Sequence, residues 1–178
     1  MTTFNSVVAV YETQAEAEAG VRDLQQSGFA LRKLSILGKE HEAGNHVIGY
    51  YDLRGHMRYW GARAAFWNDL WKVLTGAGYF RDPDIGGVLV GGPLTEWVIA
   101  ALKNPVTNGL STVGAGLHAL SIPIVSILRY EAAVKMHKLL LIAHGSSREM
   151  LETKDVLHGS RPKEINVHFA EEGALIAA

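Results

Sequence analysis

Cysteine is absent from this chain of 178 residues. Disulfides, thiolate metal sites and cysteine nucleophiles are therefore excluded, and the composition is compatible with a reducing cytoplasm. The basic residues form no run and the formal net charge is −1 at pH 7, so we expect no nucleic-acid partner. The first residues lack a basic segment and reach an acid at Glu12, so we expect no secretory signal peptide.

Recognisable catalytic and metal-binding motifs are also scarce. The eight histidines lack the HxH or HExxH spacing of metal sites, and solvated loop histidines are the expected reading. A weak site at His41 and His46, which flank Glu42, is the alternative. His144 and Ser146 could form a nucleophile pair, but no acidic residue that would orient the histidine is evident. We therefore expect no enzyme activity, no catalytic residues, no metal and no cofactor.

Charge is missing from a long internal stretch, because no Asp, Glu, Lys or Arg occurs in the 25 residues from Asn104 to Leu128. That length exceeds the roughly 20 residues that span a bilayer. Serine, threonine, asparagine and proline dilute its apolar character, and Glu96 interrupts the apolar segment before it. A buried helical hairpin, or one that lies on a membrane surface, is therefore favoured over an integral membrane protein.

The two ends of the chain repeat one plan. The run Val7–Tyr11 predicts a buried strand, Thr13 and Glu16 fit a capping box that opens a helix, Gly28 is a natural stop, and 34–37 returns as a strand. Near the C-terminus the same order recurs: a strand at 138–143, a turn at 144–145, a capping box opening at Ser146, a helix to 157 and a strand at 164–169.

Two strand–helix–strand units predict an α+β fold, a ferredoxin-like sandwich with a four-stranded antiparallel sheet. A long apolar helical hairpin insertion splits it. The expected parts are a first half at 1–40, an aromatic and glycine-rich helical insert at 41–128, a second half at 129–170 and a tail at 171–178. Within the insert we expect a helix over about 57–75, a turn at 76–84, an apolar segment at 85–102 and a further helix that starts at Pro123.

Small residues recur at four-residue intervals in the insert, which permits close helix packing. Aromatic residues interleave with arginines at its entry, which is typical of protein interfaces. We expect these features to serve contacts between subunits; the alternative is packing within one chain. The candidate oligomer-interface residues are Tyr59, Trp60, Phe66, Trp67, Trp71, Gly87, Gly91, Ser111, Ala115, Gly116 and Ala119.

A candidate anion-binding site lies where the last predicted helix begins. Gly145, Ser146 and Ser147 would present free amides and two hydroxyls there, which suits a phosphate or carboxylate. The alternative is that the same groups only cap the helix. The stretch has one glycine and no following lysine, unlike a P-loop.

Several motifs resemble the bacterial general stress protein (YflT-like) family. They are the opening VVAVYETQAEAEAGVRDLQQSGF, the aromatic block GYY…GHMRYWG…AFW, the run GLSTVGAGLHALSIP, and YE…KLLLIAHG, spread over residues 6–158. The resemblance implies a stress-associated and oligomeric protein with a glycine-zipper centre, often described as membrane-associated, and it supplies no catalytic residues. The charges at Asp69, Lys72, Arg81, Asp82 and Asp84 depart from the strongly apolar family pattern and favour a protein–protein surface.

The sequence therefore predicts a non-enzymatic, stress-associated protein that self-assembles through its insert. It would act in the cytoplasm as an oligomeric scaffold, with a membrane surface or a partner protein as further candidates for contact. The first alternative is a regulatory ferredoxin-like domain that holds a small ligand between sandwich and insert. The second is an integral membrane protein.

Overall fold

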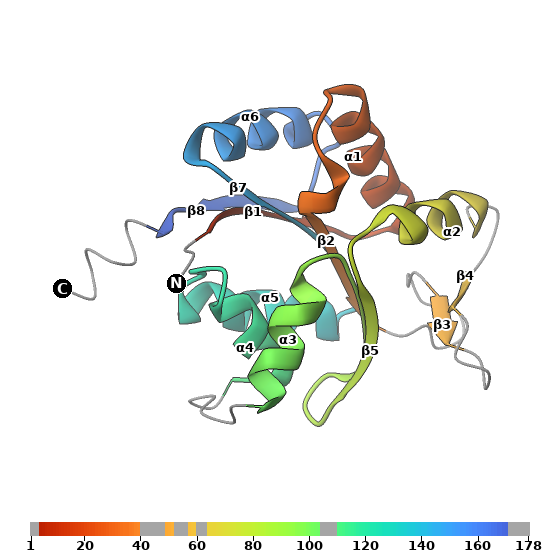
Figure 1. Ribbon diagram of the computed structural model, residues 1–178, viewed down its shortest axis with the longest axis vertical. Helices are drawn as coiled ribbons and strands as arrows, with labels where there is room; N and C mark the ends of the chain where they lie inside the picture. Colours follow the sequence, from red (N-terminus) through yellow and green to blue (C-terminus); the bar gives the residue numbers. More distant parts are fainter. Residues whose placement is uncertain (1–3, 40–48, 52–56, 60–63, 104–109, 171–178) are drawn as a thin grey trace.

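The computed structural model describes residues 4–39, 49–51, 57–59, 64–103 and 110–170. Within them the chain forms an α+β fold with a six-stranded antiparallel sheet in the order β5-β6-β2-β7-β1-β8 (Figure 1). The strands of this sheet are β1 (Asn5–Tyr11), β2 (Leu34–Lys39), β5 (Ala77–Asp82), β6 (Gly86–Gly91), β7 (Leu139–Gly145) and β8 (Glu164–His168). A separate small hairpin pairs β3 (Gly49–Tyr51) with β4 (Met57–Tyr59).

Helices cover both faces of the sheet, which gives three layers (Figure 1). One face carries α1 (Gln14–Gln26), α2 (Ala64–Val73) and α6 (Ser147–His158), with the short 3-10 helix η1 (Leu31–Lys33) beside them. The other carries α3 (Leu94–Lys103), α4 (Thr112–His118) and α5 (Ile124–Lys135). We call the layer of α1, α2, α6 and η1 the terminal layer, and the layer of α3, α4 and α5 the insert layer.

The sheet needs two layers because its central strands are apolar on both sides. In β1 the odd positions Val7, Ala9 and Tyr11 pack into the core under the terminal layer, and Val8 and Val10 pack into the core under the insert layer. Successive strand side chains point to opposite faces, so an unbroken apolar run is buried only if both faces are covered.

Most predicted elements of the two ends are confirmed. Thr13 accepts a hydrogen bond from the Glu16 amide at the start of α1, and Gly28 follows the helix with φ +83°. Ser146 and Glu149 form a complete capping box at the start of α6. The predicted turn at 144–145 is wrong, since both residues continue β7, paired with Ser6 and Asn5 of β1.

The prediction of a helical hairpin insert is corrected, because strands form part of this region. Residues 57–59 form β4, and among the described residues of the helix expected over 57–75 the helical part is α2. The expected turn at 76–84 contains β5, and the apolar segment at 85–102 divides into β6 and α3 at Gly92 and Pro93. A short buried apolar run has no decisive periodicity, so its sequence suits a helix or a strand. Pairing with β2 makes β6 a strand.

Gly92 and Ser35 fasten the insert layer to the sheet at the junction of β6 and α3. The amide of Leu94 donates to the buried Ser35 hydroxyl at 2.9 Å, which satisfies one free amide at the start of α3. Gly92 has φ +92°, and a β-carbon there would lie 2.1 Å from the carbonyl oxygen of Leu34. Only glycine fits this approach of two backbones.

A buried carboxylate makes a second attachment. Asp82 ends β5 and is 1% exposed. One of its oxygens accepts from the amides of Asp84 and Ile85 in the β5–β6 turn, and the other accepts from the Thr112 amide at 3.0 Å. The carboxylate therefore joins the hairpin to the first turn of α4, where a negative charge is favourable.

Gly92→Ala tests the backbone approach. We expect a loss of at least about 3 kcal/mol in the free energy of unfolding, or failure to fold, because the new methyl group overlaps the β2 backbone. Urea denaturation followed by circular dichroism measures it. The matched control is Gly28→Ala, which has a similar positive φ but open space, and should lose only about 1 kcal/mol. Equal losses in the two variants would contradict the steric argument.

Candidate functional site

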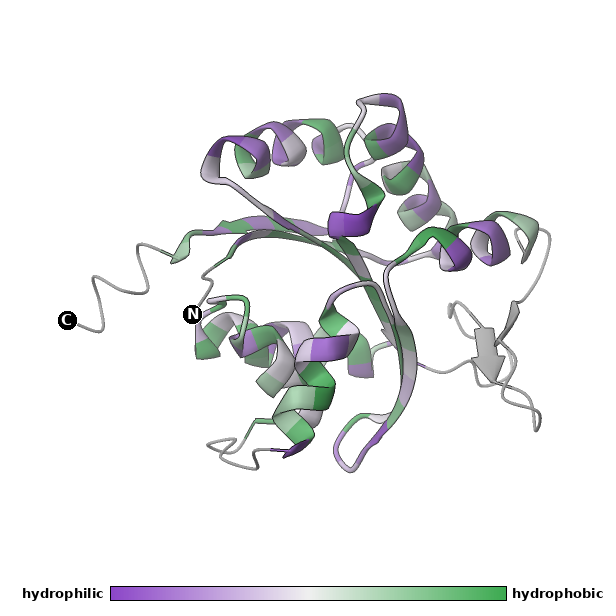
Figure 2. Cartoon of the chain, viewed as in Figure 1, coloured by the Kyte–Doolittle hydropathy of each residue, from purple (hydrophilic) through white to green (hydrophobic). Residues whose placement is uncertain are grey.

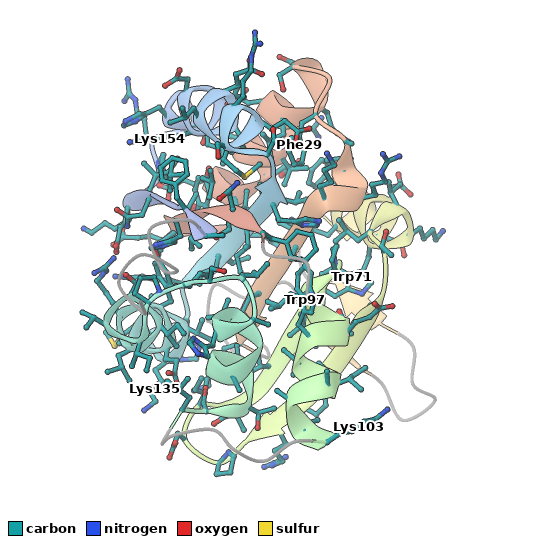
Figure 3. The ribbon with its side chains drawn as sticks, turned by 60° about the vertical axis from the view of Figure 1, so that its left-hand side comes forward. Phe29, Trp71, Trp97, Lys103, Lys135 and Lys154 are labelled. Carbon is teal, nitrogen blue, oxygen red and sulfur yellow. The ribbon has the colours of Figure 1, made fainter. Side chains whose placement is uncertain are left out.

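The aromatic residues predicted at an interface are used largely inside the chain. Trp67 is fully buried and Trp71 nearly so, both in the core between α2 and the sheet, and Phe66 packs partly buried against the same core. Figure 3 shows Trp71 directed toward the interior of the molecule. Tyr59 belongs to β4, and Trp60 lies outside the described residues. Trp67 and Trp71 are therefore unavailable for a contact between subunits.

The small residues also serve packing within one chain. A β-carbon on Gly116 of α4 would lie 2.5 Å from a methyl group of Val98 in α3. A β-carbon on Gly91 would lie 2.9 Å from Leu74 and 3.0 Å from the Trp71 ring of α2. Gly87 and Gly91 lie in strand β6, so they form no helical pair.

The other predicted small residues lie on α4 or at its ends. Ser111 is buried and caps the helix by accepting from the Gly114 amide. Ala115 is half-buried, and Ala119 is exposed just beyond the helix. Of the predicted residues on α4 and at its ends, these two alanines therefore reach the surface of the insert layer.

The insert layer has an apolar outer surface, but the residues that form it differ from the predicted interface residues. Of the eight large exposed hydrophobic residues in the described chain, six lie on this layer or directly after it: Ile99, Leu102, Ile124, Val125, Leu128 and Met136. Hydrophobic residues dominate α3 and α5, whereas polar residues dominate α1 and α6 (Figure 2). Apolar residues all round a helix were the available signal, because such a helix buries only one side of itself against the sheet.

The predicted anion site already holds a carboxylate of the protein itself, that of Glu149. Glu149 accepts from the Ser146 amide at 2.8 Å and from the Lys33 ammonium group at 2.8 Å. These bonds, the one from Lys33 foremost, lower the pKa of Glu149 to about 2, so the carboxylate is charged at neutral pH. Gly145 lies against this carboxylate, and Ser147 begins α6 with an exposed side chain. The helix-capping alternative describes this loop, and an external anion would have to displace Glu149.

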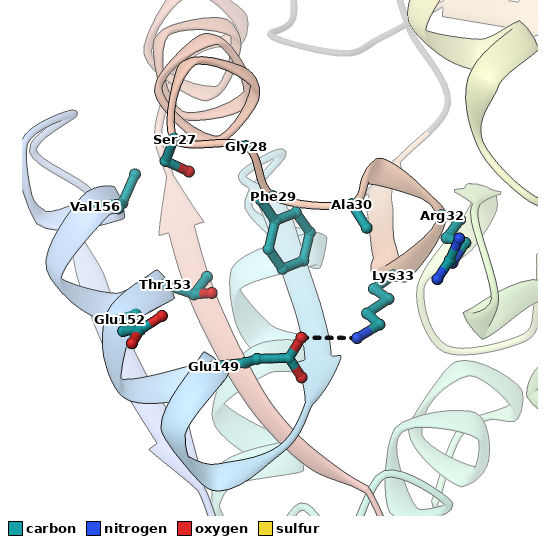
Figure 4. Close-up of a pocket in the computed structure, with 10 residues that line it drawn as sticks. All are labelled: Ser27, Gly28, Phe29, Ala30, Arg32, Lys33, Glu149, Glu152, Thr153 and Val156. Carbon is teal, nitrogen blue, oxygen red and sulfur yellow. Dashed lines mark hydrogen bonds and ion pairs between the residues drawn. The ribbon is translucent and has the colours of Figure 1, made fainter.

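A surface pocket of about 430 Å³ opens beside this ion pair (Figure 4). One wall comes from the end of α1 and from η1, and the other from α6. Residues distant in the sequence meet here, so neither wall predicted the pocket alone. The lining residues are Ser27, Gly28, Phe29, Ala30, Arg32, Lys33, Glu149, Glu152, Thr153 and Val156.

A buried polar cluster joins the insert layer to the last strand. The hydroxyl of Tyr130 on α5 and Nε2 of His168 on β8 are 2.7 Å apart, and both side chains are buried. Burial lowers the pKa of His168 to about 4, with a smaller contribution from the positive charge of Arg129, while Glu164 opposes the shift. The neutral imidazole is therefore the form that this contact holds at pH 7.

Membrane-spanning and metal-binding features are not found in the described part of the chain. No helix there is long and apolar enough to cross a bilayer. No group of three or more potential ligand side chains gathers there around a common point for a metal ion. The weak metal site considered at His41 and His46 lies outside the described residues.

Comparisons with known proteins add no assignment: no family model, curated protein or solved structure matches this chain. The resemblance to the general stress protein family therefore stays a prediction.

His168 makes folding stability depend on pH. Its pKa is about 4 in the folded chain against 6.5 ordinarily, so the unfolded chain binds the proton more readily. Stability from this group is complete above about pH 7 and is lost as pH falls from about 6.5 toward 4. We expect a loss of about 2 kcal/mol between pH 7.5 and pH 5 from His168.

Urea unfolding at the two pH values measures this loss. His168→Gln should reduce it by about that amount, because the amide does not titrate. His158→Gln is the matched control, since His158 is exposed on α6, and it should retain the full pH dependence. An unchanged pH dependence in His168→Gln would rule out the assignment.

Proposed function

We propose that this is a non-enzymatic protein that self-associates through the outer surface of its insert layer. The carrying observation is the contrast between the two helical layers: six of the eight large exposed hydrophobic residues lie on or directly after the insert layer. Exposed apolar residues that gather on one face favour association, whereas scattered ones need no explanation. The contact surface differs from the one expected from sequence, since the buried tryptophans and tightly packed glycines take no part in it.

The arrangement of the strands and helices at the two ends of the chain supports this proposal. Strands β2, β7, β1 and β8 are neighbours in that order, and α1 and α6 each connect two of them. We interpret these elements as a ferredoxin-like unit, whose second sheet face would be open. The insert extends the sheet by β5 and β6 and covers that face with α3, α4 and α5. In doing so it moves the apolar surface from the sheet to its own outer side.

A second copy of this chain is the occupant that the charges favour. Glu96, Ile99 and Lys103 lie on one exposed stripe of α3, with the acid near its start and the base at its end. A twofold axis that brings two α3 helices together antiparallel places Glu96 of each copy opposite Lys103 of the other. The same stripe on an anionic membrane would offer a single lysine, whereas membrane-surface helices are rich in basic residues.

The resemblance to the general stress protein family extends the proposal to a role in stress. The feature that this chain would share with the family is the oligomer. One of the motifs that carry the resemblance forms α4, which packs at the centre of the insert layer. Accumulation of the protein under stress, measured by immunoblot in the source organism, would be expected.

Leu102→Glu tests the association surface. Leu102 is 55% exposed on α3, so a carboxylate there should leave the fold intact while it opposes contact between copies. We expect a wild-type dimer or larger oligomer by sedimentation velocity, and a shift toward monomer of at least tenfold in the dissociation constant for the variant. Leu151→Glu is the matched control, because Leu151 is 51% exposed on α6 in the other layer. A monomeric wild type, or equal effects of both variants, would defeat the proposal.

A charge exchange on α3 tests the antiparallel geometry. Glu96→Lys and Lys103→Glu should each weaken association about threefold to tenfold, because each places like charges opposite one another across the twofold axis. The double variant should recover the wild-type dissociation constant. Additive weakening in the double variant would show that α3 does not meet its own copy in this way.

A further inference from the structure

The strand β8 forms one edge of the six-stranded sheet. It lies last in the strand order and pairs on one side, with β1 (Figure 1). An edge strand directs the backbone N–H and C=O groups of every second residue away from its sheet. No other strand of the described residues pairs with the outer side of β8. This edge can therefore accept a further strand.

Strand β8 carries few of the features that protect edge strands from such pairing. Natural proteins keep edge strands short or place lysine, proline or a β-bulge on them. The five residues of β8 include neither lysine nor proline, and their register with β1 is continuous. Pro162 and Lys163 directly precede the strand, so they limit the length of a further pairing without preventing it.

Two apolar side chains of β8 are covered only in part. Ile165 and Val167 pack against the core of the terminal layer but stay half-buried. Their register partners on β1, Ala9 and Val7, are fully buried. The difference arises because β1 has a neighbouring strand on each side and β8 has one. A strand added at the edge would place side chains beside Ile165 and Val167 and remove more of their apolar surface from water.

Polar side chains on the other face of β8 are held in place by α5. Glu164 accepts a hydrogen bond from Arg129 at 2.5 Å and one from the Asn166 amide group at 2.8 Å. His168 contacts the hydroxyl of Tyr130 at 2.7 Å. The acidic side chain of the strand is thus already paired with a cation, and it opposes an added strand less than an unpaired charge would.

We propose that β8 pairs antiparallel with β8 of a second copy of this chain, across a twofold axis at Asn166. The strand sequence EINVH is nearly symmetric in chemical character about that residue. The axis places Ile165 of one copy opposite Val167 of the other, apolar against apolar on one face. On the other face it places Glu164 opposite His168 and Asn166 opposite itself, so no like charges meet.

The pleat of the sheet and the twofold symmetry favour this register together. Residues directly opposite each other in a sheet share a face, so the axis has to pass through a residue and not between two. An axis at Asn166 pairs all five residues of β8, whereas an axis at Ile165 or Val167 pairs fewer. A strand of unrelated sequence would lack this match of apolar with apolar and acid with imidazole, which is why a second copy is the occupant.

This contact uses different residues from the surface proposed on α3. A five-residue pairing adds about four to six backbone hydrogen bonds and buries far less than the roughly 1,600 Å² of a standard interface. It is therefore weak by itself, and it adds to association through the insert layer without replacing it. Two different twofold contacts on one chain would extend dimers into larger assemblies. Failure of either proposal leaves the other standing.

Asn166→Cys tests the pairing, because the chain contains no cysteine and the axis brings this position opposite itself. Opposed residues of an antiparallel pair have α-carbons about 4.5–5.5 Å apart, a separation that a disulfide spans. Under mild oxidation we expect a covalent dimer on a non-reducing gel. Ala77→Cys is the matched control, because Ala77 is exposed on β5 at the opposite edge of the sheet. Its dimer should form at least tenfold more slowly, and equal rates would overturn the proposal.

Second substitutions in the Asn166→Cys chain separate this contact from others. Ile165→Lys should slow cross-linking at least tenfold, because a charge then lies opposite Val167 of the other copy. Val73→Lys is its control and should leave the rate unchanged, since Val73 is 58% exposed at the end of α2. Leu102→Glu should leave the cross-link in place. Its loss there would show that the edge contact depends on α3, contrary to the proposal.

Hydrogen–deuterium exchange of the unsubstituted chain, followed by mass spectrometry, gives a measurement that needs no variant. We expect the amides of 164–168 to exchange more slowly as the protein concentration rises, because the second copy accepts hydrogen bonds from the outer amides. The amides of β5 at the other edge are the internal reference and should not change. Protection of β8 that is independent of concentration would show that a segment of the same chain covers the edge, and it would overturn the proposal.

Discussion

Burial of both faces of one apolar sheet is the constraint on which the rest of this molecule depends. The adjacent central strands β1 and β7 carry hydrophobic side chains on alternate sides, and each set enters a different core. Such strands cannot leave one face to water without a large loss of hydrophobic free energy. The helices α1, α2 and α6 cover one face, and α3, α4 and α5 therefore have to cover the other.

This requirement explains the unusual composition of the insert. Glycines bring helices and strands into close contact, as at Gly116 beside Val98 and at Gly92 over the β2 backbone. The buried tryptophans of α2 fill the core beside β6. Ser35 and Asp82 accept hydrogen bonds from free amides at the starts of α3 and α4. These bonds attach the insert layer to the sheet, and a shift of the layer would leave buried polar groups without partners. The insert, whose sequence predicts a role in assembly, thus forms layers of the fold that cover the sheet.

The proposal of self-association follows from the residues that this packing leaves exposed on the helices. Two helices of the insert layer, α3 and α5, bury one side each and retain apolar residues on the other, which gives the surface proposed for self-association. In the terminal layer the outer surfaces of α1 and α6 are polar, and the feature left there is the pocket with oppositely charged walls.

The sequence by itself determined the local elements of the two ends. Alternating or continuous apolar runs, capping residues such as Ser146 and Glu149, and Gly28 after α1 act within a few residues, so their outcome is visible in the chain. The absence of cysteine likewise excluded disulfides and thiolate chemistry without reference to a fold.

Tertiary structure decided everything that needs two distant segments. Residues 86–91 became a strand because β2 offered an edge to pair with, although the same apolar letters suit a helix. The sequence alone predicts a subunit interface for Gly91 and Trp71, because the contact between them inside the chain joins residues that are remote in sequence. The pocket between η1 and α6 has the same origin, because Lys33 and Glu149 are separated by 116 positions and meet only when η1 folds against α6.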